Sequence, residues 1–175
     1  TDYKVIGLSA TPLLVYPFEK IIHTYTLYDA LINKDIVTPQ ILWFTKEGKL
    51  SNNEIMEQID IIIKDLPYKK IVIWCGLIKE CYELALLWNK YFKDFKVCID
   101  TSSDEYINNE LGTFYDFKNL NNNGYLFCAA KHREGSDIKN LDGCIFLDKV
   151  ENRNSKTFVQ CIGRVLRKDN LNKKK

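Results

Sequence analysis

Short apolar runs rich in β-branched residues alternate with segments of helical periodicity along most of this chain. The runs lack polar alternation, which is typical of strands buried on both faces of a sheet. Strands of this kind that are separated by amphipathic helices pack as a parallel sheet covered by helices on both faces, so the α/β class is predicted. Strands are expected at residues 4–8, 39–44, 70–75, 96–100, 125–130 and 144–148, and helices at residues 28–34, 52–66, 79–92 and 155–167. Residues 104–120 are expected to hold one or two helical pieces, broken near Gly112. Asn52 or Asn53 is expected to cap the helix that begins there.

The size of the chain, 175 residues, fits one domain or one domain with part of another. Hydrophobic residues make up 46% and charged residues 27%, which provides enough apolar material for one core and excludes a disordered chain. No apolar run approaches the roughly 20 residues that cross a bilayer, and the N-terminus lacks the pattern of a signal peptide. Because the chain opens on Thr1 rather than Met, we expect a piece of a longer polypeptide.

The six cysteines form no C-x-x-C pair and have no metal-ligand spacing, and four of them lie in expected strands. We therefore expect small buried hydrophobic side chains with reduced thiols. Reduced thiols indicate a cytoplasmic or nuclear protein, or one from a viral factory or virion if the chain is viral. No metal ligand is predicted, because His132 has neither a cysteine nor a second histidine at ligand spacing.

Polar segments follow several of the expected strands. In parallel α/β sheets, functional residues lie in the loops that leave the carboxyl ends of the strands. The candidate segments are residues 9–11, 76–79, 130–137 and 148–155.

The last expected helix carries an amide and two guanidinium groups on one face. Spacings of four and three place Gln160, Arg164 and Arg167 together, opposite an apolar stripe. All four arginines of the chain lie in its last third, in a sequence that otherwise uses lysine. A retained arginine is a candidate for a site that needs a planar fork of donors. The alternative is an ordinary solvated helix face.

The segment before it, residues 129–137, follows an expected strand. Gly135 and Ser136 permit a turn with exposed amides, and Asp137 is placed to accept hydrogen bonds from hydroxyl groups. The rim of this loop is basic, with Lys131, His132 and Arg133. The alternative is a surface loop without a function.

Taken in order, these segments resemble the closing motifs of superfamily 2 helicases. Ser9-Ala10-Thr11-Pro12 resembles motif III, residues 134–137 (EGSD) resemble motif V, and residues 160–167 (QCIGRVLR) resemble motif VI. Residues 71–79 resemble a degenerate motif IV. The sequence of residues 162–167, together with the lysine- and asparagine-rich composition of the chain, resembles that of helicases from large DNA viruses. The chain differs from DEAD-box RNA helicases, which have a threonine where Ala129 or Ala130 stands.

The resemblance implies a RecA-like fold of the P-loop NTPase type and only the closing part of a two-lobe motor. Residues 1–35 would be the end of the first lobe and a linker, residues 36–170 the second lobe, and residues 171–175 a tail. The phosphate-binding loop G-x-x-x-x-G-K-[ST] is absent from the chain. ATP and Mg²⁺ would therefore be bound mainly by the first lobe, and this chain alone is expected to lack ATPase activity.

The resemblance also implies roles for individual residues. The arginine fingers would be Arg164 and Arg167, with Gln160 beside the γ-phosphate or the attacking water. Gly135 and Asp137 would contact the nucleotide. The nucleic-acid phosphates would be bound by the loop residues Gly76, Lys79, Ser102, Lys131 and Arg133. Coupling between the lobes would involve Ser9 and Thr11. The implied partners are DNA rather than RNA and the first lobe of the same polypeptide, with no membrane.

Two alternatives remain open at this point. One is a non-catalytic α/β module whose basic end contacts nucleic acid or a protein. The other is a motor that translocates along nucleic acid without unwinding it.

Overall fold

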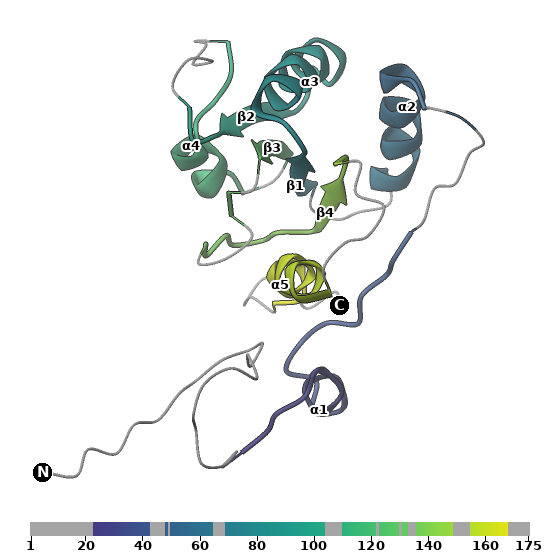
Figure 1. Cartoon of the computed structure of the whole chain (residues 1–175), viewed down its shortest axis with the longest axis vertical. Helices are drawn as coiled ribbons and strands as arrows, with labels where there is room; N and C mark the ends of the chain where they lie inside the picture. Colours follow the sequence, from purple (N-terminus) through teal and green to yellow (C-terminus); the bar gives the residue numbers. More distant parts are fainter. Residues whose placement is uncertain are drawn as a thin grey trace, which may run out of the picture.

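The computed structural model describes residues 23–42, 48, 50–64, 69–103, 110–121, 123–129, 131–132, 136–148 and 155–167. The described helices are α1 (Leu27–Ile32), α2 (Asn52–Ile63), α3 (Ile78–Tyr91), α4 (Phe114–Asn119) and α5 (Ser155–Val165). The described strands are β1 (Lys70–Cys75), β2 (Lys96–Asp100), β3 (Gly124–Ala129) and β4 (Gly143–Phe146). Figure 1 labels these elements.

The four strands form one sheet in the order β2-β3-β1-β4, and every neighbouring pair is parallel. In register, Ile73 of β1 lies opposite Phe127 of β3 on one side and Ile145 of β4 on the other. The central strands β1 and β3 are almost wholly buried, as continuous apolar runs predict. The predicted α/β class is therefore confirmed, and the sheet is consistent with a RecA-like domain.

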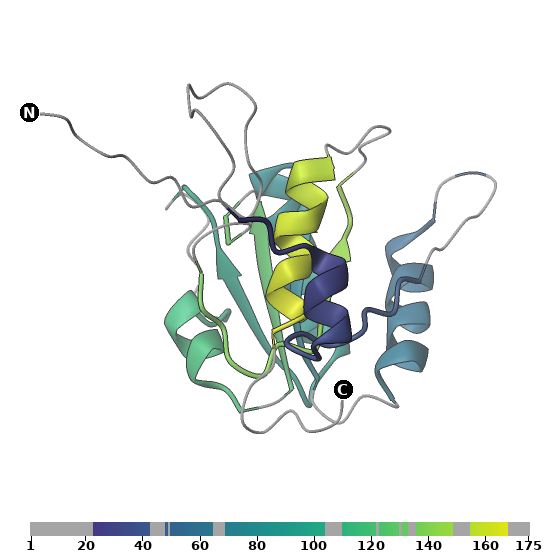
Figure 2. The ribbon, with the colours of Figure 1, turned by 90° about the horizontal axis from the view of Figure 1, so that it is seen from below.

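Helices cover both faces of the sheet (Figures 1 and 2). On one face, α2 and α3 pack against the odd-numbered side chains of β1, including Ile71 and Ile73. On the other face, α4 and α5 pack against the even-numbered side chains, including Val72 and Trp74. Alternate residues of one strand thus enter two separate cores, because side chains alternate across a sheet.

The parallel arrangement sets the position of the candidate site. All four strands end at the same edge of the sheet, so the segments after β1, β2 and β3 lie at that edge. The chain after β3 continues through residues 136–142 to β4, and α5 follows. This path brings the polar residues after β3 beside α5.

The segment that follows α1 is joined to the end of α5. The amide of Val37 donates to the carbonyl of Leu166 (3.0 Å), and Ile36 forms an antiparallel bridge with Arg167. Figure 2 shows α1 in purple beside α5 in yellow. The expected start of the second lobe, residue 36, is thus attached to the segment that carries the arginine pair.

Two local predictions are corrected. Residues 39–42 form no strand, since the chain pairs with the end of α5 rather than with the sheet, and residues 43–44 lie outside the described residues. The cap of α2 is Ser51, not Asn52 or Asn53. Its side chain accepts a hydrogen bond from the amide of Glu54, whose carboxylate accepts one from the Ser51 amide in return. The strand expected at residues 4–8 lies outside the described residues.

Five of the six cysteines are buried, and Cys144 is partly buried, which confirms the expectation of small core side chains. Burial raises the pKa of the Cys98 thiol to about 12. A hydrogen bond with Cys81, together with burial, raises the pKa of Cys75. These thiols are therefore protonated and unreactive at neutral pH. Within the described part of the chain, no helix has the length and apolar character needed to cross a bilayer.

Lys70 is a fully buried lysine at the start of β1. Its Nζ donates to the carbonyls of Leu120 (2.8 Å) and Lys118 (3.1 Å) at the end of α4, and lies 5.1 Å from the centre of the Phe117 ring. Burial lowers the pKa of Lys70 from 10.5 to about 8. The folded chain therefore loses this proton about two pH units before the unfolded chain does.

The expected result is a stability increment from Lys70 that appears as the pH rises from about 8 to about 10.5, because the unfolded state binds more protons in this window. Urea unfolding of the wild type and of Lys70→Met, at pH values of about 7.5 and about 10, should show a relative gain of roughly 2 kcal/mol for the wild type at the higher pH. Other groups titrate in both proteins and cancel in the difference. Equal pH dependence of the two proteins would contradict this role for Lys70.

Candidate arginine-rich site at the carboxyl edge of the sheet

The helix α5 packs one side against the sheet and presents Arg164 from the other. It ends at Val165 rather than at residue 167 as predicted, and Arg167 follows it in the bridge with Ile36. Cys161 is fully buried, and the Phe158 ring lies 5.8 Å from the ring of Phe146 in β4. Gln160 and Arg164 are partly buried, and the Arg167 side chain is 50% exposed. One side of α5 is buried because the apolar stripe of the helix packs into the core on this face of the sheet.

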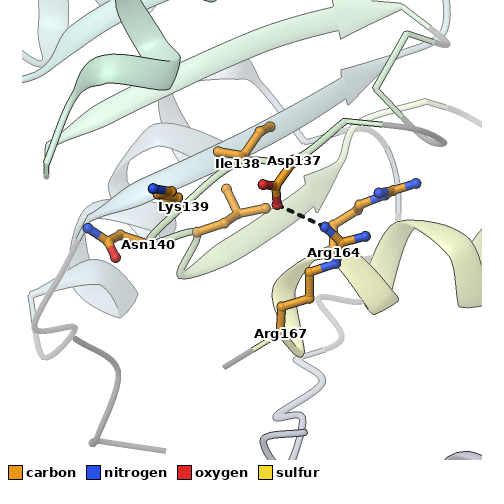
Figure 3. A pocket seen from close by; sticks show the side chains of 7 residues that line it. Asp137, Ile138, Lys139, Asn140, Arg164 and Arg167 are labelled. Carbon is orange, nitrogen blue, oxygen red and sulfur yellow. Dashed lines mark hydrogen bonds and ion pairs between the residues drawn. The ribbon is translucent and has the colours of Figure 1, made fainter. Parts of the chain in front are cut away.

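Both arginines contact the polar segment that follows β3, and Figure 3 shows the contact of Arg167 with Asp137. Nη1 of Arg167 donates to Oδ1 of Asp137 at 3.0 Å, and Nη1 of Arg164 donates to the carbonyl of Ser136 at 2.8 Å. The segments that resemble motifs V and VI are thus in direct contact, although 28 to 30 residues separate these partners.

A small pocket of about 70 Å³ lies between these segments, lined by Asp137, Ile138, Lys139, Asn140, Leu141, Arg164 and Arg167. A space of this size holds a few water molecules and is too small to enclose a nucleotide. By themselves, the described residues here form one wall and do not enclose a nucleotide.

The chemistry of this wall fits a phosphate. Guanidinium groups present a planar fork that matches phosphate oxygens, and a carboxylate accepts hydrogen bonds from hydroxyl groups. The ion pair between Arg167 and Asp137 is open to solvent, since the two side chains are 50% and 72% exposed. Such pairs contribute at most about 1 kcal/mol, so an anionic ligand displaces Asp137 from Arg167 at little cost.

Gly163 precedes the first of these arginines on α5. A Cβ built at this position meets no heavy atom of the described residues within 4 Å, apart from the backbone of its own helix. The glycine is therefore not required by packing among the described residues, although glycine costs a helix about 1 kcal/mol relative to alanine. The open space beside it is the place where another surface can approach α5 closely.

Four of the expected nucleic-acid contacts lie at the carboxyl edge. Gly76 follows β1, and Lys79 lies in the first turn of α3, with its Nζ 3.9 Å from Glu83 Oε1 in an exposed pair. Ser102 follows β2 and is exposed, and Lys131 follows β3. These residues come from the three adjacent strands β2, β3 and β1, so they form one row along the edge.

A hydrogen-bonded cluster around His132 lies in the same row. Its Nε2 is 2.6 Å from Oδ2 of Asp100, and its Nδ1 is 2.5 Å from Oγ of Ser136. The imidazole stacks on Phe114 at a centroid distance of 4.0 Å. Oδ1 of Asp100 accepts a hydrogen bond from Nζ of Lys131 at 2.8 Å. One carboxylate therefore holds two side chains of the loop after β3.

The remaining expected site residues, Gly135, Arg133, Ser9 and Thr11, lie outside the described residues. Sequence reasoning missed Asp100 and Phe114, and it placed His132 in the basic rim of the loop without predicting its partners. A usable signal for Asp100 was its position as the last residue of a buried strand, where parallel sheets place functional groups. Phe114 carried no comparable signal.

Among the described residues, no group of three or more histidine, cysteine or acidic side chains is arranged to hold a metal ion. Comparisons of the chain with family models, with curated proteins and with solved structures found no match.

Proposed function

We propose that this chain is the second RecA-like lobe of an ATP-dependent superfamily 2 helicase or translocase that acts on nucleic acid. The observation that carries the proposal is the contact of Asp137 and Ser136 with Arg167 and Arg164 beside an incomplete pocket. In such a motor, ATP binds between two lobes, and guanidinium groups from the second lobe stabilise the charge that develops during phosphoryl transfer. The open side of the pocket is where the first lobe would supply the phosphate-binding loop and the Mg²⁺ ligands.

The residues of this chain then have distinct tasks. Arg164 and Arg167 would present donors to the phosphates, and Gln160 would lie one turn earlier on the same helix. Asp137 would hold Arg167 in the absence of nucleotide and accept a hydroxyl hydrogen bond when the arginine turns to a phosphate. ATP supplies the phosphoanhydride bond whose cleavage drives the motor.

The second candidate function is a non-catalytic α/β module that binds nucleic acid or a protein. The observation in its favour is that both arginines already have partners within the chain, Asp137 and the Ser136 carbonyl. A purely structural arginine pair would have the same contacts. Loss of ATP turnover without loss of folding in arginine variants would distinguish the motor from this module. Unwinding is distinguished from translocation alone by a strand-displacement assay.

The proposed partner is single-stranded DNA, bound along the row of Gly76, Lys79, Ser102 and Lys131. The expected result is weak binding of an oligothymidylate by this chain, micromolar or poorer, with affinity that falls steeply as salt rises. Fluorescence anisotropy measures both quantities. Lys131→Ala should make the salt dependence shallower by about 0.7 in the log–log slope, since one phosphate contact is lost. Tight binding that does not depend on salt would contradict the proposal.

The Gly163→Ala variant tests whether another surface approaches α5. The substitution should raise the free energy of unfolding of this chain by up to about 1 kcal/mol, because the helix gains alanine and no atom obstructs the Cβ. In the complete two-lobe protein, the same variant should lower ATP turnover, since the first lobe would meet the methyl group. Thermal melting and steady-state ATPase rates measure the two effects. A variant that is more stable and fully active would contradict close approach at Gly163.

The source in a large DNA virus and the cytoplasmic or nuclear location are part of the same proposal. They rest on sequence resemblance and on the reduced, buried cysteines.

A further inference from the structure

Asp100 binds two basic side chains that differ in their freedom to move. Its Oδ1 accepts from Lys131 Nζ at 2.8 Å, and its Oδ2 lies 2.6 Å from His132 Nε2. The Lys131 side chain is 43% exposed, whereas that of His132 is 10% exposed and stacks on Phe114. An anion from solvent can therefore reach Lys131 but not His132.

The backbone of Lys131 is fixed while its side chain is accessible. The indole Nε1 of the fully buried Trp74 donates to the Lys131 carbonyl at 2.9 Å. The next residue, His132, has a left-handed backbone with φ of 61°. This conformation costs a non-glycine residue on the order of 1 kcal/mol, and both ring nitrogens are held by hydrogen bonds. The Lys131 side chain can therefore exchange Asp100 for another anion while the backbone of the loop stays in place.

The second nitrogen of His132 leads towards the arginine pair. Nδ1 lies 2.5 Å from the hydroxyl of Ser136, and the Ser136 carbonyl accepts from Arg164 Nη1 at 2.8 Å. A path therefore runs from Asp100 through His132 to the Ser136 hydroxyl by hydrogen bonds, and through the covalent frame of Ser136 from its carbonyl to Arg164. It joins the expected nucleic-acid row to the expected nucleotide site within one lobe.

We propose that Asp100 is a built-in competitor for nucleic-acid phosphate at Lys131, and that His132 is a positioning residue that carries the exchange to Ser136 and Arg164. The inference rests on the proposed binding of single-stranded DNA. A phosphate offers Lys131 the same anionic oxygens as the carboxylate does. When a phosphate binds the Lys131 side chain, Asp100 retains His132 of these two partners. The hydrogen bonds from His132 to Ser136 and from Arg164 to Ser136 then change in geometry.

Asp100→Asn tests the competition, because asparagine keeps an acceptor for His132 and removes the charge that holds Lys131. We expect two- to five-fold tighter binding of a labelled oligothymidylate of about 15 nucleotides at low salt, the scale of an exposed ion pair. The matched control is Asp94→Asn, an exposed carboxylate before β2 at the opposite edge of the sheet, which should change the affinity little. In a Lys131→Ala background, Asp100→Asn should have no effect.

The outcomes separate this inference from the proposed function. An equal effect of the Asp100 and Asp94 variants, or an Asp100 effect that persists without Lys131, would overturn the competition. If no variant binds the oligonucleotide at all, the proposed nucleic-acid function fails, and the competition fails with it. Thermal melting checks that Asp100→Asn is folded. If it is not, Asp100→Ser replaces it as the variant without the charge, and it must likewise tighten binding.

The path through His132 is tested by NMR, without an assay of enzyme activity. The chain contains only two histidines, His132 and the exposed His23, so imidazole NMR signals are readily assigned. Lys131→Gln, and separately the oligothymidylate, should shift the His132 signals and leave those of His23 unchanged. The oligothymidylate should also shift the Arg164 side-chain signal, and Ser136→Ala should abolish that second shift. Unchanged His132 signals while the oligonucleotide is bound would overturn the path.

Discussion

Alanine at Arg164 or Arg167 is expected to lower ATP turnover of the proposed two-lobe motor by roughly 10³-fold or more, the scale of an arginine finger. The reason is geometric, since both arginines line one small pocket, Arg164 from the last turn of α5 and Arg167 from two residues after its end. Steady-state ATPase rates at saturating nucleic acid measure the effect. Lysine at either position should restore little, because an ammonium group lacks the planar fork of donors.

The two variants should differ in stability. Arg167→Ala removes an exposed ion pair with Asp137 and should change the free energy of unfolding by less than about 1 kcal/mol. Arg164→Ala removes a partly buried donor to the Ser136 carbonyl and should cost somewhat more, about 1–2 kcal/mol. Near-normal turnover in both variants would mean that the arginines only join α5 to the loop after β3. Lost turnover together with a collapsed melting temperature would likewise assign them a structural role.

Trp88→Ala should be the most damaging single substitution for folding among those considered, with a loss of about 3–5 kcal/mol. The indole is fully buried between α3 and the sheet, with its ring 5.0 Å from Tyr125 and 5.1 Å from Phe127, both edge-on. Domains of this size are stable by only about 5–15 kcal/mol, so the variant should unfold near physiological temperature. Urea unfolding measures the loss.

Tyr115→Ala is the control for Trp88→Ala. It removes an aromatic ring that is 74% exposed on α4, and it should change stability by no more than about 0.5 kcal/mol. Trp88→Phe keeps part of the packing and removes the indole Nε1, which has no hydrogen-bond partner among the described residues. It should therefore cost less than the alanine variant. Similar losses for Trp88→Ala and Tyr115→Ala would contradict the packing described for this face of the sheet.

The sheet could be predicted because each of its strands is a continuous apolar run bounded by polar residues. Residues 70–75 and 96–100 begin and end where the sequence pattern places them. The strand predicted at residues 39–44 is wrong for the described residues 39–42, because apolar character alone does not provide a neighbouring strand. These residues instead follow Val37, whose amide donates to the carbonyl of Leu166 just after α5.

The shared face of Gln160 and Arg164 on α5 could also be predicted, since helical spacing depends only on local sequence, whereas Arg167 lies beyond the end of the helix. The contact of this face with the loop after β3 could be expected only from resemblance, because nothing local indicates which loop the helix meets. The Asp100–His132 pair was beyond prediction. It joins residues 32 apart, and it exists because β2 and β3 are neighbours in the sheet. Strand order is a property of the whole fold, and no residue pattern within either segment specifies it.

The most direct test of the central claim compares ATP turnover by this chain alone with turnover by the complete protein, each with and without single-stranded DNA. We expect no turnover by the chain, because it lacks a phosphate-binding loop, and DNA-stimulated turnover by the complete protein that Arg167→Ala abolishes. Turnover by the chain alone that depends on its own residues would contradict the two-lobe account, as would a complete protein without DNA-stimulated ATPase activity.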